Sequence, residues 1–349
     1  MKSNPPFSKI NFSSARFRAA LWSLIVVCVF ELSIRTLVIR PAMLAFDAVW
    51  GSAPIEGACS FHALEGFGTT CYAGRNEVQT PFNSGLPVVV LGDSYTEAIQ
   101  VDNAAKYVSL TEAALRERGW DVNLINLGDS NRTIADFVYM APEIIARYAP
   151  EIVVIQTNQS GFFDSLNPRR INYFALQADG ELKVMHRDRK EWPLLAQNVI
   201  HTSGLLTLTA VRWNQTTEAI PAGDESPTDP TRAAPAHLAQ EVAQLVAAYP
   251  NSQIVILIIP GVPILFPDKI NPGWENPNDM EVLSALTQAE KISVVYPAPA
   301  FKELYKKYGV FPRGFFNSPP NYGHLNRYGH IAVAETLTAA LDALLKGAR

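Results

Sequence analysis

The sequence predicts an α/β fold built on a parallel β-sheet, and two features of the chain support this prediction. Short apolar runs rich in β-branched residues alternate with longer segments of helical character from residue 86 onward. The chain of 349 residues is also long enough to bury the core that such a sheet requires. This alternation is typical of βαβ units, whose helices cover both faces of the sheet.

Five strands and five helices carry the prediction. The strands are expected at 87–91, 122–125, 152–155, 254–259 and 292–295. The helices are expected at 103–119, 133–148, 234–249, 279–290 and 329–346. An insertion at about 163–235 separates the third strand from the fourth. Within it we predict a β-hairpin at 173–184, turned at Asp179-Gly180, and a mobile loop at 216–235 that is rich in Pro, Thr, Asp and Ala.

The N-terminal part of the chain predicts a membrane anchor. Four basic residues precede an uninterrupted apolar run at 19–30, and apolar character continues to Ile39 with Glu31 and Arg35 as interruptions. Basic residues are denser before this segment than after it, which favours a cytoplasmic N-terminus. We therefore expect a leader at 1–18, a single-pass signal anchor at 19–40, an irregular lead-in at 41–85 and an exported α/β domain at 86–349.

Composition excludes several classes of function. The net charge is -4 and no Lys/Arg run is present, so we expect no nucleic-acid partner. Three cysteines without CxxC spacing and six scattered histidines predict no metal site. No phosphate-binding glycine loop follows a strand, which weakens the reading as a nucleotide-binding module and leaves no predicted cofactor. Export makes Cys59 and Cys71 a predicted disulfide, with two unpaired apolar side chains as the alternative.

The first predicted strand ends in Gly92-Asp93-Ser94, which suggests a nucleophile. The carboxyl ends of parallel strands are where ligands and catalytic groups gather. A helix that starts there offers N–H groups able to hold a developing oxyanion. The alternative is that Ser94 only caps the helix. A second Gly-Asp-Ser occurs at 128–130, where we expect Asp129 and Ser130 to cap the helix that begins near Thr133.

A serine nucleophile needs a general base, and His324 is the best candidate. It lies in a predicted loop just before the last helix, on the sheet edge where strand ends collect. A structural role for His324 is the alternative. His330 lies at or within that helix, so we expect it to be packed or to cap the helix.

These two motifs, Gly-Asp-Ser after the first strand and His-Leu-Asn-x-x-Gly-His before the last helix, resemble those of the SGNH/GDSL hydrolase superfamily, in particular its bacterial membrane-anchored members. The resemblance implies a flavodoxin-like three-layer α/β/α sandwich with Ser94 as nucleophile and His324 as base. It implies that the N–H groups of Ser94 and Gly128, with the amide of Asn158, form the oxyanion hole. The block around Asn158 departs from the family pattern, and a shift in register would give its role to Gln159 or Ser160.

The acid of the family is missing from its usual place. Two or three residues before His324, where the family has an aspartate, this chain has Tyr322 and Asn321. Asn321 is a possible orienting residue for the imidazole, but it brings no charge. Three outcomes remain open: a weak Ser-His dyad, an acid from another loop, or a silent site. The sequence does not decide whether Asp164, Glu97 or another acid takes the role.

The sequence thus predicts an esterase or O-acyltransferase in the bacterial inner membrane, with its domain on the outer side. Its expected substrates are acyl esters, acetyl esters foremost, of a cell-envelope or secreted glycan, or a small ester. The alternative is a catalytically silent protein of the same fold that binds glycan or an assembly partner. The oligomeric state is not predicted.

Overall fold

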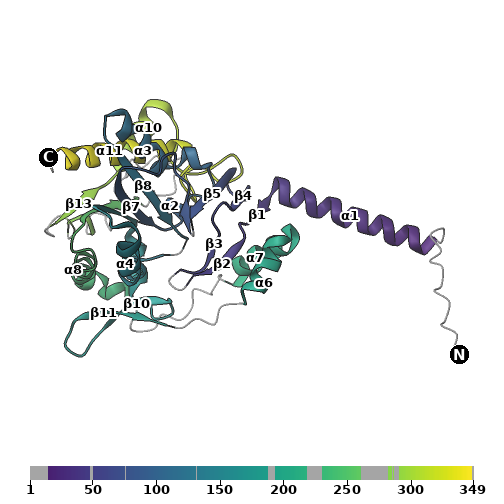
Figure 1. Ribbon diagram of the computed structural model, residues 1–349, viewed down its shortest axis with the longest axis horizontal. Coiled ribbons are helices and arrows are strands. Elements are labelled where there is room, and N and C mark those ends of the chain that lie inside the picture. Colours follow the sequence, from purple (N-terminus) through teal and green to yellow (C-terminus); the bar gives the residue numbers. More distant parts are fainter. Residues whose placement is uncertain are drawn as a thin grey trace, which may run out of the picture.

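The computed structural model describes residues 15–47, 50–74, 76–130, 132–187, 193–217, 230–260, 282–284, 286 and 291–347. Its N-terminal helix α1 (Ala15–Leu37) projects away from the body of the protein (Figure 1). Within the described residues, α1 is the one unbroken helix that is long and apolar enough to cross a membrane. The apolar helix expected near the N-terminus is therefore present, beginning and ending a few residues earlier than 19–40.

The centre of the body is a parallel sheet, and all five predicted strands are confirmed. They are β7 (Leu86–Gly92), β8 (Val122–Gly128), β9 (Ile152–Thr157), β12 (Gln253–Ile258) and β13 (Ile292–Val295). Their spatial order is β8-β7-β9-β12-β13. This is the 2-1-3-4-5 order of flavodoxin-like folds, in which ligands bind where the strand order reverses.

Helices cover both faces of this sheet, as predicted (Figure 1). On one face lie α4 (Ile134–Tyr148) and α8 (Pro230–Ala248), and on the other lie α3 (Tyr107–Glu117), α10 (Ala298–Tyr308) and α11 (Arg327–Gly347). Alternate residues of each strand face opposite layers. Val89 and Val153 therefore pack with Phe137 of α4, whereas Val90 and Val154 belong to the core with α3 and α11.

Four of the five predicted helices are present, with three differences. The segment 103–119 is divided into a 3₁₀ turn, η1 (Asn103–Ala105), and α3. The helix α10 was not predicted, because prolines at 297 and 299 resemble a loop although proline is tolerated in the first turn of a helix. The helix α8 begins at Pro230, so the loop prediction at 216–235 extends too far; 218–229 lie outside the described residues, as does much of the helix predicted at 279–290.

The prediction of an irregular lead-in at 41–85 is wrong. The structure forms β1 (Ile39–Arg40), β2 (Leu44–Asp47), β3 (Gly51–Pro54), β4 (Cys59–His62), β5 (Gly68–Gly74) and β6 (Glu77–Val78). Antiparallel β1, β4, β5 and β6 extend the central sheet, since Val78 of β6 pairs with Asn126 of β8. Most of these strands are too short to show an alternating pattern in the sequence. They form because they pair with neighbouring strands, and intrinsic propensity contributes little.

The insertion contributes a separate group of small elements. The predicted hairpin is present as β10 (Asn172–Leu176) and β11 (Leu182–His186). Two helices follow, α6 (Leu194–Thr202) and α7 (Gly204–Thr217), beside the base of α1 (Figure 1). The short elements α2 (Ser94–Glu97), α5 (Gln159–Phe163) and η2 (Asp164–Leu166) follow the carboxyl ends of β7 and β9.

Candidate active site

A sharp turn from β7 into α2 presents Ser94. Gly92 lies so close to its neighbours that a Cβ there would come 1.9 Å from Thr96 Oγ1 and 2.6 Å from Gln156 Oε1. Asp93 caps the helix, because its carboxylate accepts the N–H of Tyr95 at 2.9 Å. The cap is therefore Asp93 and not Ser94, which leaves the Ser94 hydroxyl available for another partner.

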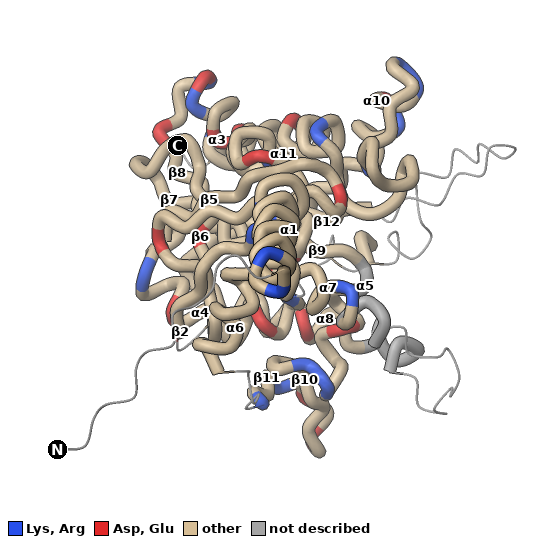
Figure 2. The backbone as a smooth tube through the Cα atoms, turned by 90° about the vertical axis from the view of Figure 1, so that its right-hand side faces the viewer, with Lys and Arg blue, Asp and Glu red and all other residues tan. Residues whose placement is uncertain are grey.

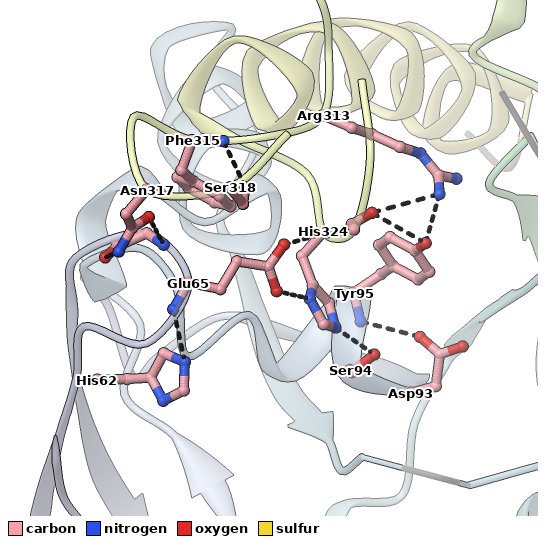
Figure 3. Close-up of polar contacts among 12 residues, drawn as sticks. His62, Glu65, Asp93, Ser94, Tyr95, Arg313, Phe315, Asn317, Ser318 and His324 are labelled. Atoms are coloured by element: carbon pink, nitrogen blue, oxygen red, sulfur yellow. Dashed lines mark hydrogen bonds and ion pairs between the residues drawn. The ribbon is translucent and has the colours of Figure 1, made fainter. Parts of the chain in front are cut away.

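That partner is His324, as the sequence predicted. His324 Nε2 lies 3.0 Å from Ser94 Oγ, although 230 positions separate the two residues (Figure 3). Backbone hydrogen bonds to the segment 312–314 fix the loop that carries His324. The N–H of Gly314 donates to the carbonyl of His324, and the N–H of Asn326 donates to the carbonyl of Pro312. The imidazole is thus placed to accept the serine proton.

The acid that completes this site is Glu65, which sequence reasoning missed. Its Oε2 lies 2.5 Å from His324 Nδ1, and its Oε1 accepts the backbone N–H of His324 at 2.9 Å (Figure 3). Gly323 makes this approach possible, since a Cβ there would come 2.0 Å from Glu65 Oε1. Ser94, His324 and Glu65 therefore form a chain of the kind found in serine hydrolases.

The electrostatics of Glu65 suit this position. Burial raises the pKa of the carboxyl, but the hydrogen bonds from the His324 ring and backbone N–H outweigh burial and hold the pKa below its usual value. The carboxylate therefore stays ionised at neutral pH and opposes the positive charge that His324 gains on taking a proton.

A network of hydrogen bonds fixes the turn that carries Glu65. Asn317, from the segment before the histidine loop, accepts the N–H of Gly66 at 2.8 Å and donates to the carbonyl of Ala63 at 2.9 Å. The N–H of Glu65 donates to His62 Nε2 at 3.3 Å (Figure 3). Burial lowers the pKa of His62 to about 4, so its ring is neutral and able to accept this bond.

A disulfide encloses the same turn. Cys59 of β4 pairs opposite Cys71 of β5, and the structure joins the two sulfurs. Glu65 lies within the loop that this bond closes, between the two strands. The pair predicted from the sequence thus holds the hairpin that supplies the acid.

The Ser94 N–H is the candidate oxyanion donor that the geometry supports best. Of the four N–H groups in α2, those of Tyr95, Thr96 and Glu97 already donate to Asp93. Among the hydrogen bonds of the described residues, the Ser94 N–H has no acceptor. It therefore remains free beside its own hydroxyl, where a substrate oxyanion would form.

The structure does not support the role expected of Gly128. Its N–H donates to Asn126 Oδ1 at 2.9 Å, two residues earlier, which is a local bond that the strand pattern did not reveal. Asn158 follows β9 as predicted, and its Oδ1 accepts the N–H of Gly161 at the start of α5 at 2.9 Å. That bond occupies the amide oxygen and leaves the donor role of the Asn158 amide nitrogen as a proposal.

Asn321 does not have the role expected of it, whereas His330 does. Asn321 is buried, its N–H donates to the carbonyl of Arg313, and Glu65 occupies the position beside the imidazole where Asn321 was expected. His330 is packed as predicted: it stacks on Tyr107 and accepts that residue's N–H at 3.2 Å, and burial lowers its pKa to about 3.

The second Gly-Asp-Ser has a structural role different from the one expected. Ser130 Oγ donates to Glu97 at 2.6 Å, and Asp129 pairs with Arg132 at 2.7 Å. The helix α4 is capped instead by Thr133, which forms a capping box with Asp136. Neither Asp129 nor Ser130 caps the helix, since Thr133 itself stands at the N-cap position.

The known proteins to which this chain is similar include an esterase. No protein-family model matches the chain. The esterase TesA of Pseudomonas aeruginosa is 26% identical over 84 residues, which are 24% of this chain and 42% of that protein, so the match spans less than half of the relative. A crystal structure of TesA superposes with a TM-score of 0.42 at 15% identity, covering 74% of this chain and 99% of the other.

A member of the lipolytic G-D-S-L family from Veillonella parvula superposes with a TM-score of 0.36 at 11% identity, covering 72% of this chain and 96% of the other. The relative that is similar to this chain in sequence is thus an esterase.

Proposed function

We propose that this protein is a serine ester hydrolase of the SGNH/GDSL type. The observation that carries the proposal is the chain Ser94–His324–Glu65, with contacts of 3.0 Å and 2.5 Å. A hydroxyl, a base and an ionised acid in this order are what nucleophilic acyl transfer requires.

The geometry supports the following reaction. Ser94 Oγ attacks the ester carbonyl carbon while its proton passes to His324 Nε2, and the Ser94 N–H, aided by the Asn158 amide, holds the oxyanion. The tetrahedral intermediate collapses, the bond to the leaving alcohol breaks, and His324 returns the proton to that alcohol. Water, activated by the same imidazole, then releases the acid and regenerates Ser94.

We further propose that α1 anchors the chain in a bacterial inner membrane, with the α/β domain outside. The supporting observation is the apolar helix, whose side chains are exposed to the surroundings along most of its length. The substrate class that we propose is an acyl ester, foremost an acetyl ester, of a cell-envelope or secreted glycan, or a small ester. In the O-acyltransferase alternative, a sugar hydroxyl replaces water in the second step.

A non-catalytic protein that binds glycan or an assembly partner is the second candidate. The engagement of the Gly128 N–H by Asn126 favours it, since that N–H is then unavailable to an oxyanion. The absence of an acid before His324 no longer favours it, because Glu65 supplies one.

Active-site labelling tests these proposals on the full chain in detergent. We expect a fluorophosphonate probe to label the protein and p-nitrophenyl acetate to be hydrolysed, and both signals to vanish in Ser94→Ala. The matched control is Ser130→Ala, the serine of the second Gly-Asp-Ser, which should keep both. No labelling and no turnover in the folded wild-type chain would reject the hydrolase. Full complementation of a deletion by Ser94→Ala would favour the binding protein.

A further inference from the structure

The helices α6 and α7 form a pair whose amphipathic arrangement is reversed. On α6 the polar side chains face the protein: Asn198 bonds both backbone groups of Leu44, and His201 Nδ1 lies 2.7 Å from the carbonyl of Ala42. Two apolar side chains of the same helix face outward, Leu195 at 78% and Val199 at 51% exposure. Helices on the surface of a soluble domain normally bury the apolar face.

The apolar surface continues onto α7. Leu205, Leu206 and Trp213 are 41%, 46% and 69% exposed, and Leu206 and Trp213 are seven positions apart, on one face of the helix. The segment 194–213 contains a single Arg and no Asp, Glu or Lys. Apolar side chains exposed together on two helices that contact each other mark an interaction surface.

A carboxylate of α1 determines where this surface lies. Glu31 accepts the N–H groups of Gly204 and Leu205 and the hydroxyl of Ser203, so it caps the start of α7. Arg35, one turn further along α1, donates to the carbonyl of Thr202 at the end of α6. The helix pair is therefore joined by charged groups to the base of the N-terminal helix. Figure 2 views the molecule along α1.

The sequence of α1 relates that joint to a bilayer. The 23 residues of α1 rise about 35 Å, at about 1.5 Å per residue, which is enough to cross a hydrocarbon core of about 30 Å. Glu31 lies six residues before the end of α1 at Leu37, which corresponds to about 9 Å along the helix. A carboxylate is costly in the hydrocarbon core, and its place is at or near the interface. If α1 spans the membrane with Leu37 at its outer end, α7 begins about 9 Å below that end, at the boundary between the headgroups and the acyl chains.

We infer that α6 and α7 lie in the headgroup region on the outer side of the membrane that α1 spans, and that they hold the catalytic domain against this lipid surface. Each helix is too short to span the hydrocarbon core, and the two meet at an angle of 112°. The exposed leucines, valine and tryptophan would enter the boundary between headgroups and acyl chains, with Trp213 and Arg212 suited to the polar edge. This inference rests on the proposed membrane anchoring by α1.

Site-specific fluorescence on the full chain tests the inference. The background variant Cys28→Ser removes the free thiol, because Cys59 and Cys71 are bonded to each other. Single cysteines then carry a polarity-sensitive dye: Leu195→Cys and Leu206→Cys in the helix pair, Leu24→Cys in α1 and Lys306→Cys on α10 as the matched exposed control. The protein is reconstituted in phosphatidylethanolamine and phosphatidylglycerol vesicles with a nitroxide near the top of the acyl chain.

We expect blue-shifted, nitroxide-quenched emission at Leu195, Leu206 and Leu24, and neither effect at Lys306. Quenching at Leu24 with none at Leu195 and Leu206 would overturn the inference and leave the anchor intact. Absence of quenching at each of these three positions would overturn both the inference and the proposed membrane anchor. A blue shift at Leu206 without quenching would place a protein surface, such as a second copy of this chain, over the pair and would also overturn it.

Discussion

Replacing Glu65 by glutamine is expected to disable the base by forcing the wrong tautomer of His324. In the wild-type chain, one oxygen of Glu65 accepts the His324 backbone N–H and the other faces Nδ1. The backbone N–H can only donate, so the single oxygen of a glutamine must turn toward it. The NH₂ group then faces Nδ1 and donates to it, which moves the ring proton to Nε2, the atom that faces Ser94 Oγ.

The expected loss follows from this geometry. A protonated Nε2 is unable to accept the serine proton, and the same exchange in Ser-His-Asp proteases lowers kcat about 10⁴-fold. That corresponds to about 5 kcal/mol of transition-state stabilisation. Glu65→Ala leaves the tautomer free, so its loss should be no larger than that of Glu65→Gln.

Steady-state hydrolysis of p-nitrophenyl acetate by the purified full chain measures the effect, with thermal unfolding as the check on folding. Glu56→Gln, an exposed carboxyl in the turn between β3 and β4, is the matched control and should retain wild-type turnover. A folded Glu65→Gln protein with kcat within a few-fold of wild type would refute the assignment of Glu65 as the acid.

Three further predictions concern the hairpin that carries Glu65 and the buried Glu241 of α8. The double variant Cys59→Ala/Cys71→Ala should lose about 3 kcal/mol of stability, as expected for a disulfide whose cysteines are 12 positions apart. It should also lose turnover, because the disulfide no longer holds the hairpin that carries Glu65. An unchanged kcat in the reduced wild-type chain would contradict this expectation. Asn317→Ala removes the bonds to Gly66 and Ala63 and should lower kcat about tenfold with KM nearly unchanged, since one or two net bonds are worth about 1 kcal/mol each. Burial raises the pKa of Glu241 to about 9, so the folded state keeps it protonated, and its contribution to stability is present below pH about 4.3 and is lost as pH rises toward 9. Glu241→Gln should therefore raise stability at pH 7 by up to about 3 to 4 kcal/mol and leave it nearly unchanged at pH 4, as measured by urea unfolding at both pH values.

The parallel core and the serine–histidine contact were predictable because their signals are local. Buried strands appear as apolar runs, and strand ends meet at one edge of a parallel sheet. This reasoning found β7, Ser94 and His324 without knowledge of any contact. The capping of α2 by Asp93 in place of Ser94 depends on turn geometry, which the motif alone does not specify.

Glu65 was missed because its role depends on contacts 259 positions apart in sequence. The family pattern places the acid just before His324, Asp164 and Glu97 are the other acids named from the sequence, and the lead-in that contains Glu65 carries no sustained periodicity. One signal was available: a predicted disulfide between Cys59 and Cys71 in an exported segment is compatible with a hairpin, and Glu65 lies near its middle. The correction at Gly128 has a different cause, since a side chain two residues away takes its N–H and strand patterns carry no information about that bond.

The position of the acid links the catalytic site to the N-terminal helix. Directly after α1, Ile39 of β1 pairs with His62 of β4, and the carbonyl of Val38 accepts the N–H of Ala63 at 2.8 Å. These bonds hold the strand end from which the Glu65 turn departs. A cleavage that removed α1 together with Val38 and Ile39 would take away the strand partner of His62, the residue whose ring accepts the Glu65 N–H. Cleavage within α1 would leave that pairing intact. The two kinds of shortened chain should therefore differ in activity, because the physical requirement lies in the strand that follows the helix and not in the helix itself.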